Sequence, residues 1–155
     1  MIEIERKWLC ETSNIPIEEF VQATSITQGY LNSDPHKTIR VRTATNQGST
    51  KATLTIKGKS SQSGLSRMEV EKDLTEEEGA ELIALCNDLL ISKTRYLYYF
   101  GSHTFEIDVF IGKHEGLIIA ELELSSEDQE FIVPKWFGNE VTGNQNYYNL
   151  QLALN

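Results

Sequence analysis

Charged side chains recur in pairs two residues apart along this sequence. The pairs are Glu3/Glu5, Arg40/Arg42, Glu69/Glu71, Lys93/Arg95, Glu106/Asp108 and Glu121/Glu123. Side chains two residues apart leave the same face of a β-strand. A single strand of this kind indicates only a face in contact with water. A face in water usually mixes uncharged polar residues among its charges, so the repetition from strand to strand favours a charged surface with a chemical task.

Carboxylates and bases in such numbers can together hold a metal–polyphosphate complex. Carboxylate oxygens suit Mg²⁺ or Mn²⁺, and Arg and Lys neutralise phosphate oxygens, with Arg binding them bidentately. Carboxylates packed together repel one another unless a cation lies between them. The pattern therefore predicts an inverted barrel, with charges facing an internal cavity and apolar faces turned outward under helices or another subunit.

Alternating polar and apolar residues predict about eight short strands. Alternation is the period of a half-buried strand, and it occurs at residues 2–9, 38–42, 51–57, 67–73, 93–100, 104–110 and 117–124. The segment near residues 27–30 is counted as a further strand. Turn residues such as Gly101 and Ser102 join neighbouring strands as hairpins. We therefore expect a mainly β fold (α+β), an eight-stranded antiparallel closed β-barrel with a few flanking helices.

Three segments have helical signals. Thr75 is a good N-cap, and the acidic residues 76–78 that follow it lead into leucines at helical spacing. Residues 16–20 predict a short helix start, and residues 146–154 predict a helix that closes the chain. From the sequence, the segment 144–155 is either a lid or simple packing.

Composition limits the classes of protein to consider. The chain has 155 residues, 39% hydrophobic and 24% charged, which predicts one globular domain over residues 1–155. The net charge of -9 argues against a general nucleic-acid binder. No apolar run approaches the roughly 20 residues of a membrane span, and the first residues carry no apolar signal segment, so we expect a cytoplasmic protein with no membrane partner. Cys10 and Cys86 fit reduced core thiols.

The run Glu3-Ile4-Glu5-Arg6-Lys7 resembles the ExExK signature that opens the CYTH superfamily, the triphosphate tunnel metalloenzymes, in its compact bacterial type. Further elements follow in the family's order: Gln28-Gly29-Tyr30, Arg40-Val41-Arg42, Thr55-Ile56-Lys57, residues 64–71, Lys93-Thr94-Arg95, Glu106-Ile107-Asp108, Glu121-Leu122-Glu123 and Glu140-Val141-Thr142. The resemblance covers nearly the whole chain. It implies an eight-stranded antiparallel barrel around a tunnel that binds a triphosphate, with divalent-metal dependence.

The resemblance also implies roles for individual positions. The phosphate-binding bases would be Lys7, Arg40, Arg42, Lys57, Arg67 and Arg95, and the metal-coordinating carboxylates would be Glu3, Glu5, Glu121 and Glu123. Glu69, Glu71 and Asp108 would hold bases in place or reach metal through water. Lys93 matches a tunnel lysine thought to assist the reaction, and Tyr30 would lie near it. The attacking water would be oriented by a second metal or by Glu5 or Glu123.

These residues favour a triphosphatase that uses Mg²⁺ or Mn²⁺ and hydrolyses inorganic tripolyphosphate or a similar simple triphosphate. A short chain has little further machinery for a nucleoside. The alternatives are a class IV adenylate cyclase that makes cyclic AMP and pyrophosphate from ATP, a thiamine triphosphatase, and a non-catalytic polyphosphate- or nucleotide-binding module. The outward aromatic residues Trp8, Trp136 and 96–100 suggest a homodimer, and His36, His103 and His114 receive no role.

Overall fold

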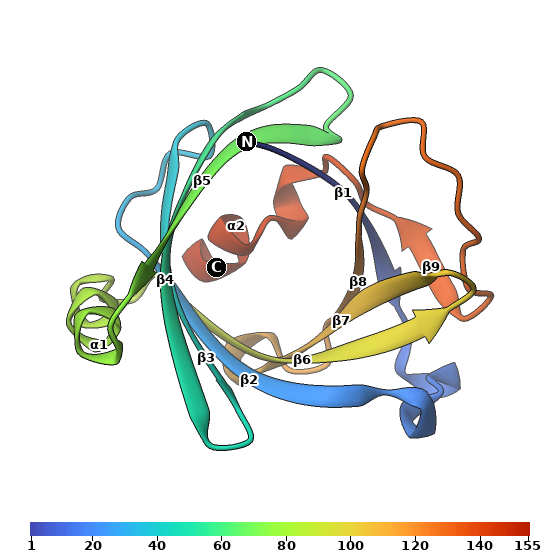
Figure 1. The fold of residues 1–155 in the computed structure, drawn as a ribbon, viewed down its shortest axis with the longest axis horizontal. Helices are drawn as coiled ribbons and strands as arrows, with labels where there is room; N and C mark the ends of the chain where they lie inside the picture. The colour runs from blue at the N-terminus through green and yellow to red at the C-terminus, as the bar shows by residue number, and fades with distance from the viewer.

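Antiparallel strands wind into a closed ring around a central space in the computed structural model, which describes residues 1–155 (Figure 1). The strands are β1 (Ile2–Cys10), β2 (Val21–Tyr30), β3 (Thr38–Asn46), β4 (Ser49–Ser60), β5 (Ser66–Leu74), β6 (Leu90–Phe100), β7 (His103–Ile111), β8 (Ile118–Glu123) and β9 (Phe137–Glu140). Their order is β5-β4-β3-β2-β6-β7-β8-β1-β9, and β5 also pairs with β1. The first eight strands therefore close the predicted eight-stranded antiparallel barrel.

Strand β9 is an addition to the strands predicted from the sequence. Along one edge of β1, residues Ile2–Ile4 pair with β5, while Trp8 and Cys10 further along pair with β9. The other edge of β1 pairs with β8 over residues 5–9. Strand β9 thus pairs with the part of this β1 edge that lies beyond β5. The pairing leaves less of the β1 edge open to association with another strand.

The predicted helix after Thr75 forms α1 (Glu76–Leu85). The Thr75 hydroxyl accepts a hydrogen bond from the Glu78 backbone N–H at 3.1 Å, and Glu78 Oε1 accepts one from the Thr75 N–H at 2.9 Å. This reciprocal capping box fixes where the helix begins. Helix α1 lies outside the barrel against β3 and β4, so closely that a Cβ on Gly79 would lie 2.6 Å from the Ala52 Cβ.

The other two segments predicted as helices contain shorter helical elements than expected. Residues 16–20 contain a 3₁₀ turn, Ile17–Glu19. In place of one helix over 146–154, the structure has a 3₁₀ turn that begins one residue earlier, Gln145–Tyr147, followed by α2 (Asn149–Leu154). No helix of this structure is long and apolar enough to cross a membrane.

Helix α2 lies within the ring of strands and fills one end of it (Figure 1). Its Leu152 packs in a buried cluster with Ile91, Phe110 and Ile119. Each of these three strand residues lies an even number of positions from an inward-facing charged residue, so they too face the interior. The interior is therefore charged along only part of its length, which corrects the expectation that apolar faces turn only outward.

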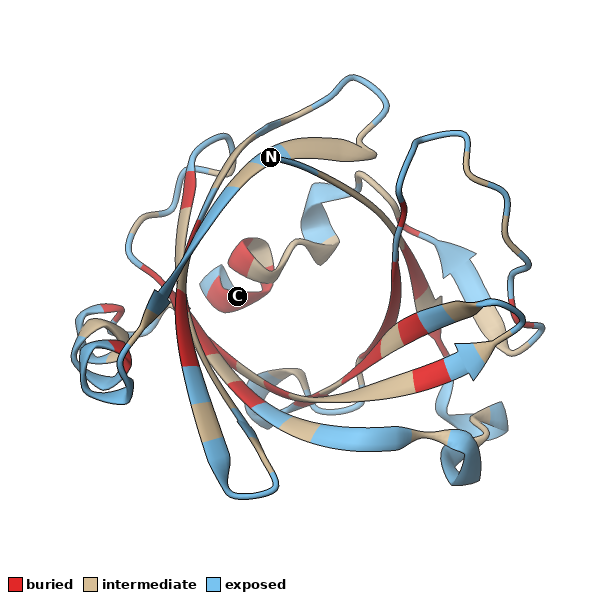
Figure 2. Cartoon of the chain, in the orientation of Figure 1, coloured by how far each residue is buried: buried red, intermediate tan, exposed pale blue.

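The largest apolar cluster lies on the outer face of the barrel and includes Trp8, Tyr98 and Phe105. Trp136 and Phe137, which follow strand β8 in the chain, pack against this cluster, and Trp8 is only 2% exposed. The chain itself thus covers Trp8, Tyr98 and Phe105, whereas Tyr99 is 57% exposed. In Figure 2, β5 contains no buried residue, in contrast with β8.

Candidate active site inside the barrel

The charged side chains gather inside the barrel around a cavity of about 240 Å³ that has no hydrophobic residue in its lining. A smaller cavity of about 50 Å³ adjoins it and shares six of its lining residues. The predicted site residues that line the first cavity are Glu3, Glu5, Lys7, Arg40, Arg42, Lys57, Glu69, Glu71, Lys93, Arg95, Glu121 and Glu123. Arg67 and Tyr30 line the second cavity, and Asp108 is fully buried beside Lys93 and Arg95.

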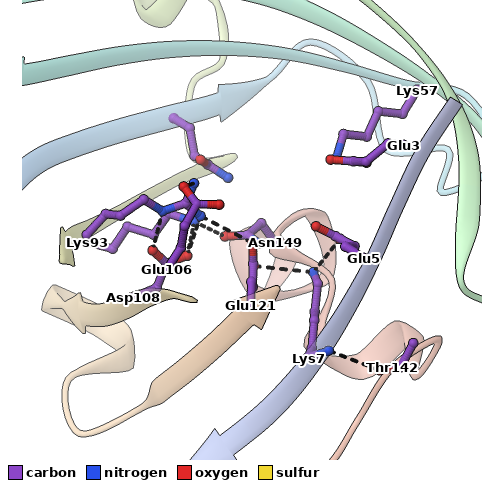
Figure 3. A network of polar contacts seen from close by, with 12 residues as sticks. Glu3, Glu5, Lys7, Lys57, Lys93, Glu106, Asp108, Glu121, Thr142 and Asn149 are labelled. Atoms are coloured by element: carbon purple, nitrogen blue, oxygen red, sulfur yellow. Dashed lines mark hydrogen bonds and ion pairs between the residues drawn. The ribbon is translucent and has the colours of Figure 1, made fainter. Parts of the chain in front are cut away.

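Asp108 is the centre of a buried ionic network on the β6–β7 hairpin (Figure 3). Its Oδ1 accepts a hydrogen bond from Arg95 Nε at 2.7 Å, and its Oδ2 accepts from Arg95 Nη2 at 2.8 Å and from Lys93 Nζ at 2.7 Å. Antiparallel register places Arg95 directly opposite Asp108. The same guanidinium donates to Glu106 at 2.7 Å and to Glu121 at 3.3 Å. Asp108 and Arg95 therefore fix the base-bearing wall of the cavity.

Burial and neighbouring charges shift the pKa values of Asp108 and Lys93 within this network. Burial alone would raise the pKa of Asp108, but Arg95 and Lys93 hold it well below its usual range. Burial lowers the pKa of Lys93 to about 7, with Arg95 and Arg42 adding to the effect and Asp108 opposing it. A lysine whose pKa is lowered in this way can lose its proton at a pH closer to neutral than an exposed lysine can.

A second set of ion pairs lies across the cavity, on β1, β4 and β8 (Figure 3). Lys57 Nζ lies 2.6 Å from Glu3 Oε2. Lys7 Nζ lies 3.4 Å from Glu5 Oε1 and 3.6 Å from Glu121 Oε1. Each lysine is thereby shared between carboxylates, and the interior alternates in sign rather than forming one acidic and one basic patch.

The carboxylates of β1 and β8 have the chemistry of a divalent-cation site. Glu5 lies opposite Glu123 in the strand register, and burial together with Glu3 and Glu5 raises the pKa of Glu123. Such mutual repulsion is what a bound cation relieves. In the present arrangement no three acidic, histidine or cysteine side chains converge at metal-ligand spacing. Glu3 is bound to Lys57 instead, so it would have to exchange that lysine for the ion.

Three arginines line the remaining wall, and their partners are largely neutral. Gln28 Oε1 accepts from Arg42 Nε at 3.0 Å and Nη2 at 2.8 Å, and burial lowers the Arg42 pKa to about 10. Arg40 donates to Thr55 at 3.1 Å, while its buried Nε has no partner. Arg67 donates to the carbonyl oxygen of Gly58 at 2.9 Å. Guanidinium groups held by neutral acceptors keep their charge available for an anion.

Two further carboxylates that were predicted as site residues, Glu69 and Glu71, lie next to these bases. Glu71 Oε2 accepts a hydrogen bond from the Thr55 hydroxyl at 3.0 Å and lies 3.9 Å from Arg40 Nη2. Glu69 lies 3.5 Å from Lys57 Nζ. Both are therefore placed where a carboxylate could orient a base, while each also borders the cavity.

Tyr30 and Lys93 have separate partners. The Tyr30 hydroxyl accepts a hydrogen bond from Gln28 Nε2 at 3.0 Å, and its ring packs against Leu150 of α2. Lys93 bonds instead to Asp108 and Asn149, and no hydrogen bond joins it to Tyr30. Their expected proximity stays a prediction.

The C-terminal segment brings residues into the site that were not predicted from the sequence. The Tyr148 ring centre lies 5.6 Å from Lys7 Nζ and 5.5 Å from the Arg67 guanidinium carbon. Asn149 contacts Lys93. Neither residue belongs to a charged pair or an alternating strand, so no local pattern marked it. Gln28 is fully buried and holds Arg42, but its sequence position in Gln28-Gly29-Tyr30 does not show that burial.

A closed barrel whose interior holds both bases and carboxylates has the chemistry to bind a polyanion together with a metal ion. The CYTH domain family matches residues 1–151, and the chain belongs to this family. Members of the family depend on metal in general.

Two relatives match this chain in sequence, and one solved structure matches it in fold, over nearly their whole length. An inorganic triphosphatase of Acetivibrio thermocellus is 38% identical over 154 residues, covering 99% of this chain and 94% of the relative. An inorganic triphosphatase of Nitrosomonas europaea is 39% identical over 157 residues, covering 99% and 98%. A crystal structure of an inorganic triphosphatase superposes with a TM-score of 0.67 at 34% identity, covering 99% of this chain and 95% of that one.

Proposed function

We propose that this protein is a divalent-metal-dependent triphosphatase that hydrolyses inorganic tripolyphosphate or a similar simple triphosphate inside the barrel. The observation that carries the proposal is the interior cavity of about 240 Å³, lined by bases and carboxylates without a hydrophobic residue. The near-full-length similarity to inorganic triphosphatases supports the same activity. Such a lining suits a chain of phosphates better than a nucleobase, which needs apolar contacts.

The bases would bind the substrate and neutralise its charge. Arg40, Arg42 and Arg95 present guanidinium groups to the larger cavity, and Arg67 presents one to the adjoining cavity. Lys7 and Lys57 add ammonium groups between the carboxylates. Phosphoryl transfer depends mainly on positioning and on electrostatic stabilisation of the phosphate oxygens.

The carboxylates of β1 and β8 would hold Mg²⁺ or Mn²⁺: Glu3, Glu5, Glu121 and Glu123. Such an ion, when bound, supplies positive charge to the phosphate oxygens. Glu5 or Glu123 would also orient the attacking water and accept its proton, and the raised pKa of Glu123 suits a proton acceptor. Asp108, Glu69 and Glu71 would keep the bases in place, Lys93 would assist proton transfer, and Tyr30 would line the substrate site.

Product analysis tests this proposal. Purified protein with Mg²⁺ or Mn²⁺ is offered tripolyphosphate, ATP and thiamine triphosphate in parallel. We expect orthophosphate to be released fastest from tripolyphosphate. Cyclic AMP and pyrophosphate from ATP would show a cyclase, preference for thiamine triphosphate would show that activity instead, and tight binding without turnover would show a binding module.

The finer predictions belong to this proposal as well. We propose a single CYTH domain over residues 1–155 and a cytoplasmic location, with no nucleic-acid or membrane partner. A homodimer also stays a prediction. The exposed apolar side chains on neighbouring strands that could form its interface are Ile2, Ile56, Met68 and Val70. Sedimentation would measure the state of association.

A further inference from the structure

The ammonium group of Lys93 is held by groups from two different parts of the chain. Lys93 is fully buried on β6 and donates to Asp108 Oδ2 on β7 at 2.7 Å. It also donates to Asn149 Oδ1, the side chain of the first residue of α2, at 3.1 Å. Figure 3 shows both contacts with Lys93. Its Nζ lies 5.5 Å from the centre of the Phe110 ring.

Helix α2 holds the Asn149 side chain in a fixed place. Leu152 anchors the helix in the buried cluster at the end of the barrel. Beyond it, Lys113 Nζ donates to the carbonyl oxygen of Ala153, and the His114 ring nitrogen lies 2.6 Å from the carbonyl oxygen of Leu152. Basic groups at the carboxyl end of a helix satisfy its unpaired carbonyls. The helix is thus tied at its far end, and Asn149 at its near end is aimed at Lys93.

We propose that Asn149 is a positioning residue for Lys93, so that α2 supplies part of the active site as well as closing the barrel. The inference rests on the proposed function for its effect on turnover. A neutral lysine amine has two N–H groups, which matches the two acceptors, Asp108 and Asn149. The remaining position on the nitrogen is then left for the cavity that Lys93 lines. An ammonium donates from that position to substrate, and an amine accepts a proton there.

The neutrality of the Asn149 amide matters because Lys93 already faces several charges. The charged groups that act on it are Asp108 on β7, Arg95 on β6, Arg42 on β3 and Glu121 on β8. Their sum, together with burial, lowers the pKa of Lys93 to about 7. An amide oxygen orients the nitrogen in both protonation states without adding a full negative charge, which would favour the ammonium form.

Two variants with opposite expected effects, and one control variant, test the proposal. Asn149→Asp adds a carboxylate at the contact, Asn149→Leu removes the acceptor at similar volume, and Asn146→Asp adds the same charge to an exposed position three residues earlier. The pKa of Lys93 is measured by NMR titration of metal-free, ¹³C-lysine-labelled protein, with the Lys93 signal identified by its loss in Lys93→Arg. The pH dependence of tripolyphosphate hydrolysis is recorded for the same proteins.

We expect the Lys93 pKa to rise by about one to three units in Asn149→Asp, because an opposite charge favours the ammonium. It should fall in Asn149→Leu and stay unchanged in Asn146→Asp. In Asn149→Leu we expect kcat to fall by about 10- to 100-fold with little change in KM, as for other residues that orient a functional group. The two Asn149 variants should shift the Lys93 pKa in opposite directions. A single variant that folds is therefore sufficient to test whether Asn149 acts on Lys93.

An unchanged Lys93 pKa in a folded Asn149 variant, as judged by thermal melting, would overturn the inference. So would a kcat loss in Asn149→Leu that Asn146→Asp reproduces. If the wild-type protein does not hydrolyse tripolyphosphate, the proposed function fails, yet the NMR titration still decides whether Asn149 acts on Lys93. The two failures are therefore distinguishable.

Discussion

At the scale of single residues, Glu5 shows how this interior keeps its charges. Burial by itself would raise the pKa of Glu5, but Lys7 and Lys57 bring it below its ordinary value. The carboxylate therefore stays ionised at neutral pH inside the barrel. An ionised oxygen ligand opposite Glu123 is what a divalent cation and an attacking water both require.

Glu5→Gln should abolish triphosphatase activity, by at least about 100-fold, while leaving the fold intact. The amide has nearly the same shape but neither charge nor basicity. Orthophosphate release and the thermal melting curve measure the two effects. Glu11→Gln is the matched control because Glu11 is exposed and makes no side-chain cap. Normal turnover in Glu5→Gln would show that the role assigned to Glu5 is wrong.

Lys93 should make stability depend on pH in the alkaline range. Its pKa falls from the ordinary 10.5 to about 7 in the folded protein, so between these values the unfolded chain binds more protons and stability rises with pH. The free energy of unfolding of wild type minus that of Lys93→Met should therefore increase with pH, by about 0.7 kcal/mol per pH unit at pH 7, where the folded lysine is half-protonated, and by about 1.4 kcal/mol per pH unit near pH 9.

Urea unfolding of both proteins at pH 7, 8 and 9 measures this difference. Asp108 keeps Arg95 as a partner in the variant, and groups that titrate equally in both proteins cancel. A difference that stays flat with pH would mean that Lys93 remains protonated in the folded state throughout this range.

At the scale of elements, α2 has a role that its length does not suggest. A six-residue helix is too short to be stable alone, and it forms here because Leu150, Leu152 and Ala153 are buried inside the barrel. The apolar end of the barrel and the apolar face of the helix thus stabilise each other. The same packing brings Tyr148 and Asn149 to the two interior cavities.

Leu152→Ala should destabilise the protein by about 2 to 5 kcal/mol, because it leaves a cavity among buried side chains. It should also lower turnover, since the helix that carries Asn149 loses its anchor. Leu154→Ala is the control on the same helix, since Leu154 is 45% exposed, and it should change stability by less than about 0.5 kcal/mol. Urea denaturation and phosphate release measure both variants, and equal effects at the two positions would contradict the assignment of α2 as the end of the barrel.

The sequence was most informative where one element imposes a strict period. Strands β1, β6 and β7 alternate charged and apolar residues, and the structure places their charged faces inside the barrel. The Thr75 capping box marked the start of α1 for a similar reason, because its residues are local in sequence. Strand β9 was missed because it has four residues and only a partly buried Phe137.

The position of α2 depends on contacts between residues distant in sequence. The apolar inward positions Ile91, Phe110 and Ile119 continue the charged rows of their strands, and nothing in the local pattern shows that a helix fills the space between them. The contact of Lys93 with Asn149 spans 56 residues for the same reason. The roles of the charged residues came from resemblance to a family, and the structure adds the partners that hold them.

At the scale of the whole molecule, an acidic protein concentrates its bases in one enclosed space. The net charge is -9, yet half of its 14 Lys and Arg residues are the bases assigned to the site: Lys7, Arg40, Arg42, Lys57, Arg67, Lys93 and Arg95. The closed barrel separates them from the acidic exterior and from bulk water, where their interaction with phosphate would be weaker. Under the proposed function, such a barrel would favour a narrow, highly charged ligand.

The most direct test of this account is a crystal structure of the Glu5→Gln variant with tripolyphosphate and Mg²⁺ or Mn²⁺. The variant should bind the substrate without turning it over. We expect phosphate density within the barrel, in contact with Arg40, Arg42 and Arg95, and a cation beside the carboxylates of β1 and β8. Tripolyphosphate bound only on the outer surface, with the interior ion pairs unchanged, would contradict the central claim that the charged lumen is the substrate site.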